Sequence, residues 1–202
     1  MEEKINDNPI IKQTVNYSSK PVNFPPIPNP PSINNIVIDK IIVKHGNAGA
    51  TTEINITKRD DVNNNILQYE TKDNVPVTYL WSYKNQHLIA EIVNATYSDA
   101  CKKMGNGNEQ TGKTKLEDIA AKVEPTANDF IDINNLRTQL PDAMITTYKY
   151  KPLVGVESIT DSHGITTFYE YDSFGRLTDV KIGENGGNTK RNIEKYIYNY
   201  KQ

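Results

Sequence analysis

The sequence is poor in several features that mark common classes of protein. A single cysteine, Cys101, among 202 residues excludes an intrachain disulfide. Lysine and arginine number 23 against 25 acidic residues, so the net charge of −2 provides no basic field for nucleic acid. No apolar run approaches the ~18 residues of a membrane span, and the polar first residues do not resemble a signal peptide. Nucleic-acid binding and a membrane-spanning segment are therefore not expected.

Composition favours sheets that have one face in water. Hydrophobic residues make up only 36% of the chain, while asparagine, tyrosine and threonine are common. Residues 1–35 show no periodicity and are predicted to form an extended, proline-rich arm. That segment contains six clustered prolines: Pro21, Pro25, Pro26, Pro28, Pro30 and Pro31. Residues 36–94 are predicted to form β-hairpins, because Ile36–Val43 and Thr52–Thr57 flank a glycine-containing turn.

Residues 95–141 change to helical spacing. Three short helices are predicted, from apolar residues near Tyr97–Met104, Leu116–Val123 and Ile133–Leu140. Thr114 and Glu117 have the spacing of a capping box, so the second helix is predicted to begin after Thr114. This stretch is interpreted as a helical insertion between two groups of hairpins, the second covering residues 142–202.

The chain also resembles itself at two offsets. A shift of 88 residues places Trp81 and Tyr83 on Tyr169 and Tyr171, and a shift of 21 residues places Tyr148 and Tyr150 on the same pair. In each unit two aromatic residues occupy one face of a strand, and a turn and a return strand follow. Each unit is therefore predicted to be a hairpin that pairs laterally with the next one.

The best-defined unit resembles a known repeat. Tyr169-Glu-Tyr171-Asp172-Ser-Phe-Gly175-Arg176-Leu177 matches the signature of YD repeats, the RHS-repeat family. Looser similarities around Trp81 and Tyr148 resemble the C-terminal region of RHS-like proteins of the Bacteroidetes type. The resemblance implies a mainly β fold, in which hairpin repeats form an antiparallel sheet with a small helical insertion. It also implies an exported or cell-surface location, and a structural role for the repeat residues: Tyr169, Tyr171, Asp172, Gly175, Arg176, Leu177, Tyr148, Tyr150, Trp81 and Tyr83.

Enzymatic chemistry has little support in the sequence. The P-loop pattern is satisfied by Gly107-Asn-Glu-Gln-Thr-Gly112-Lys113-Thr114, but no strand is predicted before it. A polar loop whose Thr114 caps the next helix is therefore preferred to a nucleotide site. His45, His87 and His163 are far apart and lack the spacing of metal ligands. We therefore expect no catalytic residue, no cofactor and no metal.

The expected function is a non-catalytic structural or interaction module of a longer RHS-like polypeptide. Its expected partner is a protein or the remainder of that polypeptide, and a homodimer through an edge strand is a further expectation. The alternative is a carbohydrate-binding module, because Tyr196, Tyr198 and Tyr200 alternate and form a candidate ligand face. Nucleotide binding through the P-loop pattern is the remote alternative.

Overall fold

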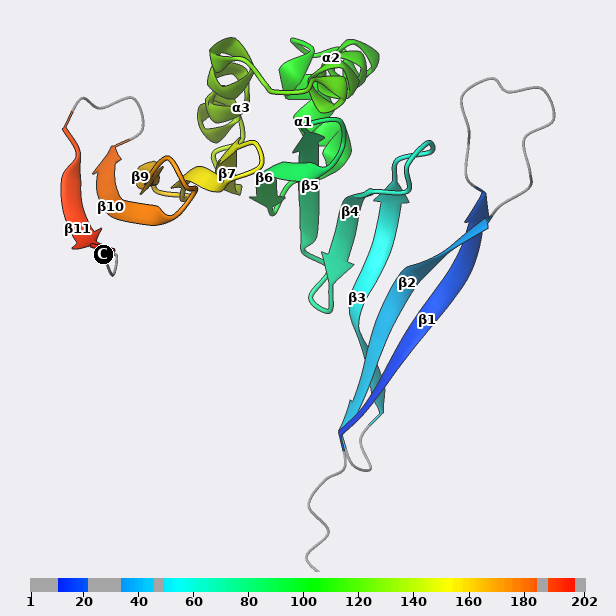
Figure 1. Cartoon of the computed structure of the whole chain (residues 1–202). Coiled ribbons are helices and arrows are strands. Elements are labelled where there is room, and N and C mark those ends of the chain that lie inside the picture. The colour runs from blue at the N-terminus through cyan, green and yellow to red at the C-terminus, as the bar shows by residue number, and fades with distance from the viewer. Residues whose placement is uncertain (1–10, 22–33, 46–48, 185–188, 199–202) are drawn as a thin grey trace, which may run out of the picture. The chain divides into compact units, whose positions relative to one another are not determined.

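The computed structural model describes residues 11–21, 34–45, 49–184 and 189–198. The described chain forms an antiparallel sheet of eleven strands, in which each strand pairs with the next in sequence, and three α-helices (Figure 1). The strands are β1 Ile11–Pro21, β2 Asn34–His45, β3 Ala50–Arg59, β4 Ile66–Thr71, β5 Pro76–Ser82, β6 His87–Val93, β7 Met144–Lys151, β8 Gly155–Thr160, β9 Ile165–Tyr171, β10 Leu177–Glu184 and β11 Arg191–Lys195. The helices are α1 Tyr97–Met104, α2 Glu109–Ala121 and α3 Ala127–Gln139. The expected mainly β fold with a small helical insertion is confirmed.

The chain divides into two compact units, residues 1–78 and 79–202. In the first unit, β1 pairs with β2 from Ile11↔His45 to Pro21↔Asn34. The prediction of an extended arm over residues 1–35 is therefore wrong for residues 11–21. Polar residues predominate in β1, so its sequence carries no strand period, and hydrogen bonds to the more apolar β2 define the strand instead. Residues 1–10 and the prolines from Pro25 to Pro31 lie outside the described residues.

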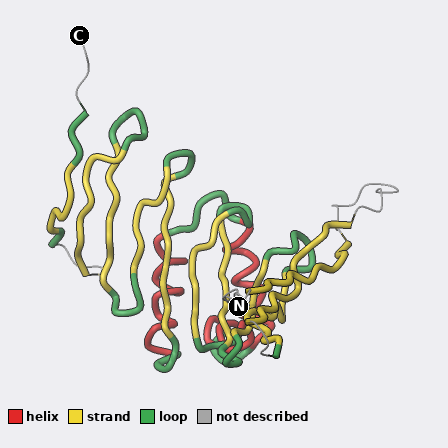
Figure 2. Tube along the Cα trace, turned by 90° about the horizontal axis from the view of Figure 1, so that it is seen from below, coloured by secondary structure: helices red, strands yellow, loops and turns green. Residues whose placement is uncertain are grey.

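The second unit contains the helices and most of the core. The three helices lie on one side of the strands from β5 to β7 (Figures 1 and 2). Apolar side chains that are almost completely buried come from both layers: Leu80, Ile89, Ile92 and Ile145 from strands, and Cys101, Leu116, Ile119, Ile133 and Leu136 from helices. Burial of this apolar surface is the main stabilising contribution to the unit.

Two polar contacts fix the helices on the sheet. The buried Ser82 hydroxyl at the end of β5 donates to the carbonyl of Ile119 in α2, at 2.6 Å. The guanidinium of Arg137 in α3 donates to the carbonyls of Asp161, at 2.6 Å, and Thr160, at 3.2 Å, as well as to the carbonyl of Ile145. Arg137 thus links one helix to β7, to β8 and to the turn after β8.

Helix α2 begins earlier than the sequence predicted. Its N-cap is Asn108, whose side chain accepts from the backbone N–H of Thr111 at 2.9 Å, so the predicted cap at Thr114 is wrong. The sequence favoured the later start because Thr114 and Glu117 have the spacing of a capping box. In the structure Gly112 is buried inside α2, where its missing side chain lets the backbone of Cys101 approach closely. No helix of the described residues is both long and apolar enough to cross a membrane.

Candidate functional site

The same turn occurs three times in the described hairpins, at residues 71–75, 161–165 and 172–176. In each turn the first residue donates its N–H to the carbonyl of the fifth, and the fourth donates its N–H to the carbonyl of the first, at 2.9–3.1 Å. The first side chain, from Thr71, Asp161 or Asp172, accepts the N–H of the fifth residue. The fourth residue has positive φ in each case: Asn74, Gly164 and Gly175. Asx-type bonding and a left-handed residue therefore define the repeated turn.

The second tyrosine of each Tyr-x-Tyr pair is bonded to a neighbouring strand. The hydroxyl of Tyr150 donates to the carbonyl of Leu88 at 3.0 Å, and that of Tyr171 donates to the carbonyl of Val156 at 2.8 Å. Tyr198 makes the same kind of bond to the carbonyl of Leu177, at 2.8 Å. The rings of Tyr150 and Tyr171 therefore lie across the strands next to their own, and the hydroxyls of all three tyrosines are bonded to backbone carbonyls.

Tyr83 and Tyr150 form the centre of an aromatic cluster with His87. The Tyr83 hydroxyl donates to the carbonyl of Tyr150 and accepts its N–H, both at 3.0 Å. The two tyrosine rings meet edge to face with centroids 5.5 Å apart, and His87 stacks on Tyr150 at 4.7 Å. Burial raises the pKa of Tyr83, and its hydrogen bond to the Tyr150 backbone offsets part of this effect. Because it joins the end of β5 to the end of β7, the cluster stabilises the sheet.

Arg176 connects the repeated turn to the segment that follows β11. Its Nε and Nη2 atoms donate to Oδ2 of Asp172, at 2.8 and 2.6 Å, and these bonds lower the pKa of the Asp172 carboxyl. The guanidinium also lies over the ring of Tyr198, 4.3 Å from its centroid. Arg176 therefore covers part of one of the tyrosines that the sequence offered as a ligand face.

The predicted ligand face is only partly described. Tyr196 and Tyr198 follow β11 and are 42% and 40% exposed, while Tyr200 lies outside the described residues. The hydroxyl of Tyr196 donates to the carboxylate of Glu194. The Tyr198 hydroxyl is thus bonded to a backbone carbonyl, and its ring faces Arg176. The Tyr196 hydroxyl is bonded to Glu194 in the preceding strand.

The P-loop lookalike does not form a phosphate cradle. Residues from Glu109 onward belong to α2, and the N–H of Gly112 donates to the carbonyl of Asn108 at 3.1 Å within that helix. A P-loop requires free amides in a loop that follows a strand, whereas α1 precedes this segment. Lys113 lies 3.6 Å from Glu117 on the surface of the same helix.

No metal site is formed by the described residues. No group of three histidine, cysteine, aspartate or glutamate side chains gathers there in a way that could hold an ion. Cys101 is buried in α1, and His163 is in the turn between β8 and β9. His45 lies at the end of β2, and its side chain is not among those described.

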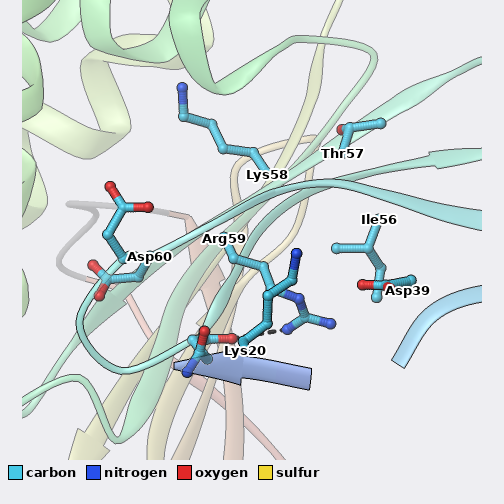
Figure 3. A pocket seen from close by; sticks show the side chains of 9 residues that line it. Lys20, Asp39, Ile56, Thr57, Lys58, Arg59 and Asp60 are labelled. Carbon is cyan, nitrogen blue, oxygen red and sulfur yellow. Dashed lines mark hydrogen bonds between the residues drawn. The ribbon is translucent and has the colours of Figure 1, made fainter. Parts of the chain in front are cut away.

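A hollow of about 490 Å³ lies beside Arg59 in the first unit (Figure 3). The guanidinium of Arg59 donates to the carbonyl of Asn64 at 2.8 Å and to the carbonyl of Ile38. Burial lowers the pKa of Arg59, and the nearby Asp39 acts in the opposite direction. The hollow is lined by three cationic side chains (Lys20, Lys58, Arg59) and three carboxylates (Asp39, Asp60, Asp61), so its charges balance. Arg59 therefore joins β2 to the turn after β3, and its surroundings favour no ion of one sign.

A second hollow, of about 260 Å³, lies between α3 and strands β7 to β9. Its lining includes the hydroxyls of Thr147, Thr160 and Thr166 and the rings of Phe130 and Phe168. The hydroxyls of Thr160 and Thr166 bond to each other at 2.8 Å, and that of Thr147 lies 3.4 Å from the Asn134 amide oxygen. Its threonine hydroxyls therefore have partners within the fold.

Comparison with known proteins gives no family. No family model and no curated protein matches the chain. Solved structures similar to it include TcdB2-TccC3 without its hypervariable C-terminal region, at 11% identity and a TM-score of 0.46 over 92% of this chain. Another is TcdB2-TccC3-Cdc42, at 11% identity and a TM-score of 0.45 over 91% of this chain. This chain spans 7% of the length of either matched chain. The resemblance to the repeat family therefore rests on the sequence motif alone.

The structure brings together only some of the residues that the sequence singled out. One turn and its flanks contain Tyr171 and the residues from Asp172 to Leu177. One aromatic cluster contains Tyr83 and Tyr150. Trp81 lies apart from that cluster's ring contacts and meets Tyr79 edge to face, with ring centroids 6.4 Å apart. Tyr148 and Tyr169 lie two residues before Tyr150 and Tyr171 in β7 and β9. Arg59 and Arg137 were missed, because their partners are backbone carbonyls that no sequence pattern reveals.

Proposed function

We propose that this chain is a non-catalytic module of a longer, exported or cell-surface polypeptide of the RHS type. Its role is to hold a strip of hairpins and present their edges and turns to a protein partner or to the rest of that polypeptide. The observation that carries this proposal is the use of each second tyrosine to bond the backbone of a neighbouring strand. Tyrosine side chains that bond the backbone of the neighbouring strand stabilise the lateral pairing of hairpins.

The last described strand suggests where such pairing continues. β11 follows β10 at the end of the sheet order and pairs with it from Asp179↔Lys195 to Ile182↔Arg191. Its residues are exposed, and its outer edge carries backbone groups that a further strand can bond. A further hairpin of the same polypeptide or the β11 strand of a second copy fits this edge. Sedimentation of the full chain over a range of concentrations distinguishes them, since self-association requires the second copy.

The carbohydrate-binding alternative depends on open tyrosine rings. Sugars stack on the faces of aromatic rings, but the guanidinium of Arg176 lies over the Tyr198 ring at 4.3 Å. The hydroxyl that would bond a sugar is bonded to Leu177. The geometry therefore favours a structural role for Tyr198.

Two tyrosine variants test the proposal directly. Tyr171→Phe removes a hydroxyl bonded to the Val156 carbonyl and should destabilise the second unit by about 1 kcal/mol, measured by urea unfolding. Tyr17→Phe is the control, because the Tyr17 ring is mostly exposed, and it should leave the midpoint unchanged. A midpoint for Tyr171→Phe equal to the wild type would remove the main support for the proposal. Saturable binding in a glycan screen that is lost in Tyr198→Ala would replace it with the carbohydrate alternative.

A further inference from the structure

The turn between β7 and β8 contains a leucine in a conformation that leucine rarely adopts. The N–H of Val154 donates to the carbonyl of Lys151 at 3.1 Å, Pro152 is the second residue of this turn, and Leu153 is the third with φ +63°. A turn with proline second and positive φ third normally has glycine or asparagine at the third position. A leucine side chain at that position strains the backbone.

The exposed side chain of Leu153 provides no packing that would offset this strain. Asn64, Asn74, Gly164 and Gly175 hold positive φ in other turns, and these residue types accept it readily. Lys84 has positive φ as well, but its exposed side chain is polar, and Tyr83 has positive φ with a buried ring bonded to Tyr150. The Leu153 side chain, by contrast, is fully exposed, at 108% of its reference area. An exposed apolar side chain held in a strained turn points to a contact outside the chain.

A second exposed apolar residue lies on the neighbouring turn. Phe174, between β9 and β10, is 75% exposed, and the guanidinium of Arg176 lies 5.3 Å from the centroid of its ring. β7 and β9 run in the same direction, so the two turns are at the same end of the sheet. They are adjacent, because a Cβ at Gly175 would lie 3.8 Å from the Val154 side chain. Leu153 and Phe174 therefore form a pair of apolar tips.

Cationic residues flank this pair. Lys151 is exposed at the end of β7, and Lys84 is exposed in the turn after β5, which the bond between Tyr83 and Tyr150 places beside it. On the same side Arg176 is bonded to Asp172, and the Glu157 carboxylate is bonded to Lys149 at 2.8 Å. Two acidic residues, Glu124 and Glu157, act electrostatically on Tyr83, and the second of them is bonded to Lys149.

We propose that these tips bind an anionic lipid surface, with Leu153 and Phe174 entering the interfacial layer and Lys84 and Lys151 facing the headgroups. Both apolar side chains project from convex turns, and a lipid interface accepts them without a pocket of matching shape. Lysines beside an apolar contact add electrostatic attraction to anionic lipid. This inference goes beyond the structural role proposed above and does not depend on it.

Vesicle co-sedimentation of the full chain tests the proposal. The chain should bind vesicles of phosphatidylcholine mixed with phosphatidylglycerol more tightly than phosphatidylcholine alone, and salt should weaken the difference. Leu153→Gly and Phe174→Ser should each reduce vesicle affinity roughly tenfold. Replacing Lys84 and Lys151 with glutamine should remove the preference for anionic vesicles.

Two variants distinguish a specific loss of vesicle binding from a loss caused by unfolding. Leu153→Gly relieves the strained φ, so its melting temperature should equal or exceed that of the wild type. Val62→Ser is the control, because Val62 is 61% exposed on a turn of the first unit, and it should bind as the wild type does. The proposal is overturned if the chain ignores vesicles, if Leu153→Gly and Phe174→Ser bind normally, or if the Val62 control loses binding to the same extent.

Discussion

Gly112→Ala should destabilise the protein although it places a better helix former in the interior of a helix. Helix propensity alone favours alanine by about 1 kcal/mol. A Cβ at Gly112, however, would lie 1.7 Å from the carbonyl oxygen and 2.5 Å from the carbonyl carbon of Cys101. Both are backbone atoms, so no side chain can rotate away, and α1 and α2 must separate.

The size of the effect follows from these opposing contributions. Overpacking commonly costs 1–3 kcal/mol, occasionally more, and a backbone overlap of this depth belongs at the upper end of that range. Separation of the helices also exposes Cys101 and Leu116, which are buried. After the gain in propensity is subtracted, we expect a net loss of about 2 kcal/mol. This corresponds to a fall in melting temperature of roughly 4–8 °C for a chain of this length.

Thermal unfolding followed by circular dichroism measures this effect. Lys113→Ala is the matched control on the same helix, because Lys113 makes only an exposed pair with Glu117 at 3.6 Å, and its melting temperature should stay within about 1 °C of the wild type. A melting temperature for Gly112→Ala equal to or above that of the wild type would refute the close contact between α1 and α2. It would also remove the reason why glycine is tolerated inside α2.

Three further predictions concern the turn, the P-loop lookalike and the helix caps. Gly175→Val should destabilise the chain by about 1–3 kcal/mol, because φ at Gly175 is +75°, and an unchanged urea midpoint would contradict this. Calorimetric titration should detect no micromolar, Mg²⁺-dependent ATP binding, and such binding, if lost in Lys113→Ala, would contradict the helical placement of Gly112. A hydrogen bond from Thr96 lowers the pKa of Asp99. Burial raises the pKa of Asp129, but bonds from Lys122 and Thr126 together outweigh burial and lower it. Both carboxylates therefore stabilise the fold above their unfolded pKa of about 3.9, and this stabilisation should be lost as pH falls through their lower folded pKa values. Asp129→Asn should make the free energy of unfolding fall less in an acid titration.

The sequence determined the repeated turn and the hairpins around it. Asp172 and Gly175 specify the turn by local chemistry, because a carboxylate that accepts nearby N–H groups and a residue that tolerates positive φ act within five residues. The β-branched residues of Ile36–Val43 and the helical spacing near Tyr97 are likewise local signals, and a strand and a helix lie there in the structure. The mainly β class of the fold followed from such patterns.

Tertiary structure alone decided where β1 and α2 begin and what the tyrosines do. β1 exists through its pairing with β2, although twelve residues of sequence separate the two strands, and the polar side chains in β1 give no sign of this pairing. The start of α2 depends on Gly112. Its missing side chain allows a close contact with the backbone of Cys101, and the residues next to Gly112 in the sequence do not specify that contact. The bonds from Tyr150 to Leu88 and from Tyr171 to Val156 join different strands, so their partners are set by sheet register. A sequence encodes local preference directly, whereas it encodes partners distant along the chain only through the fold that brings them together.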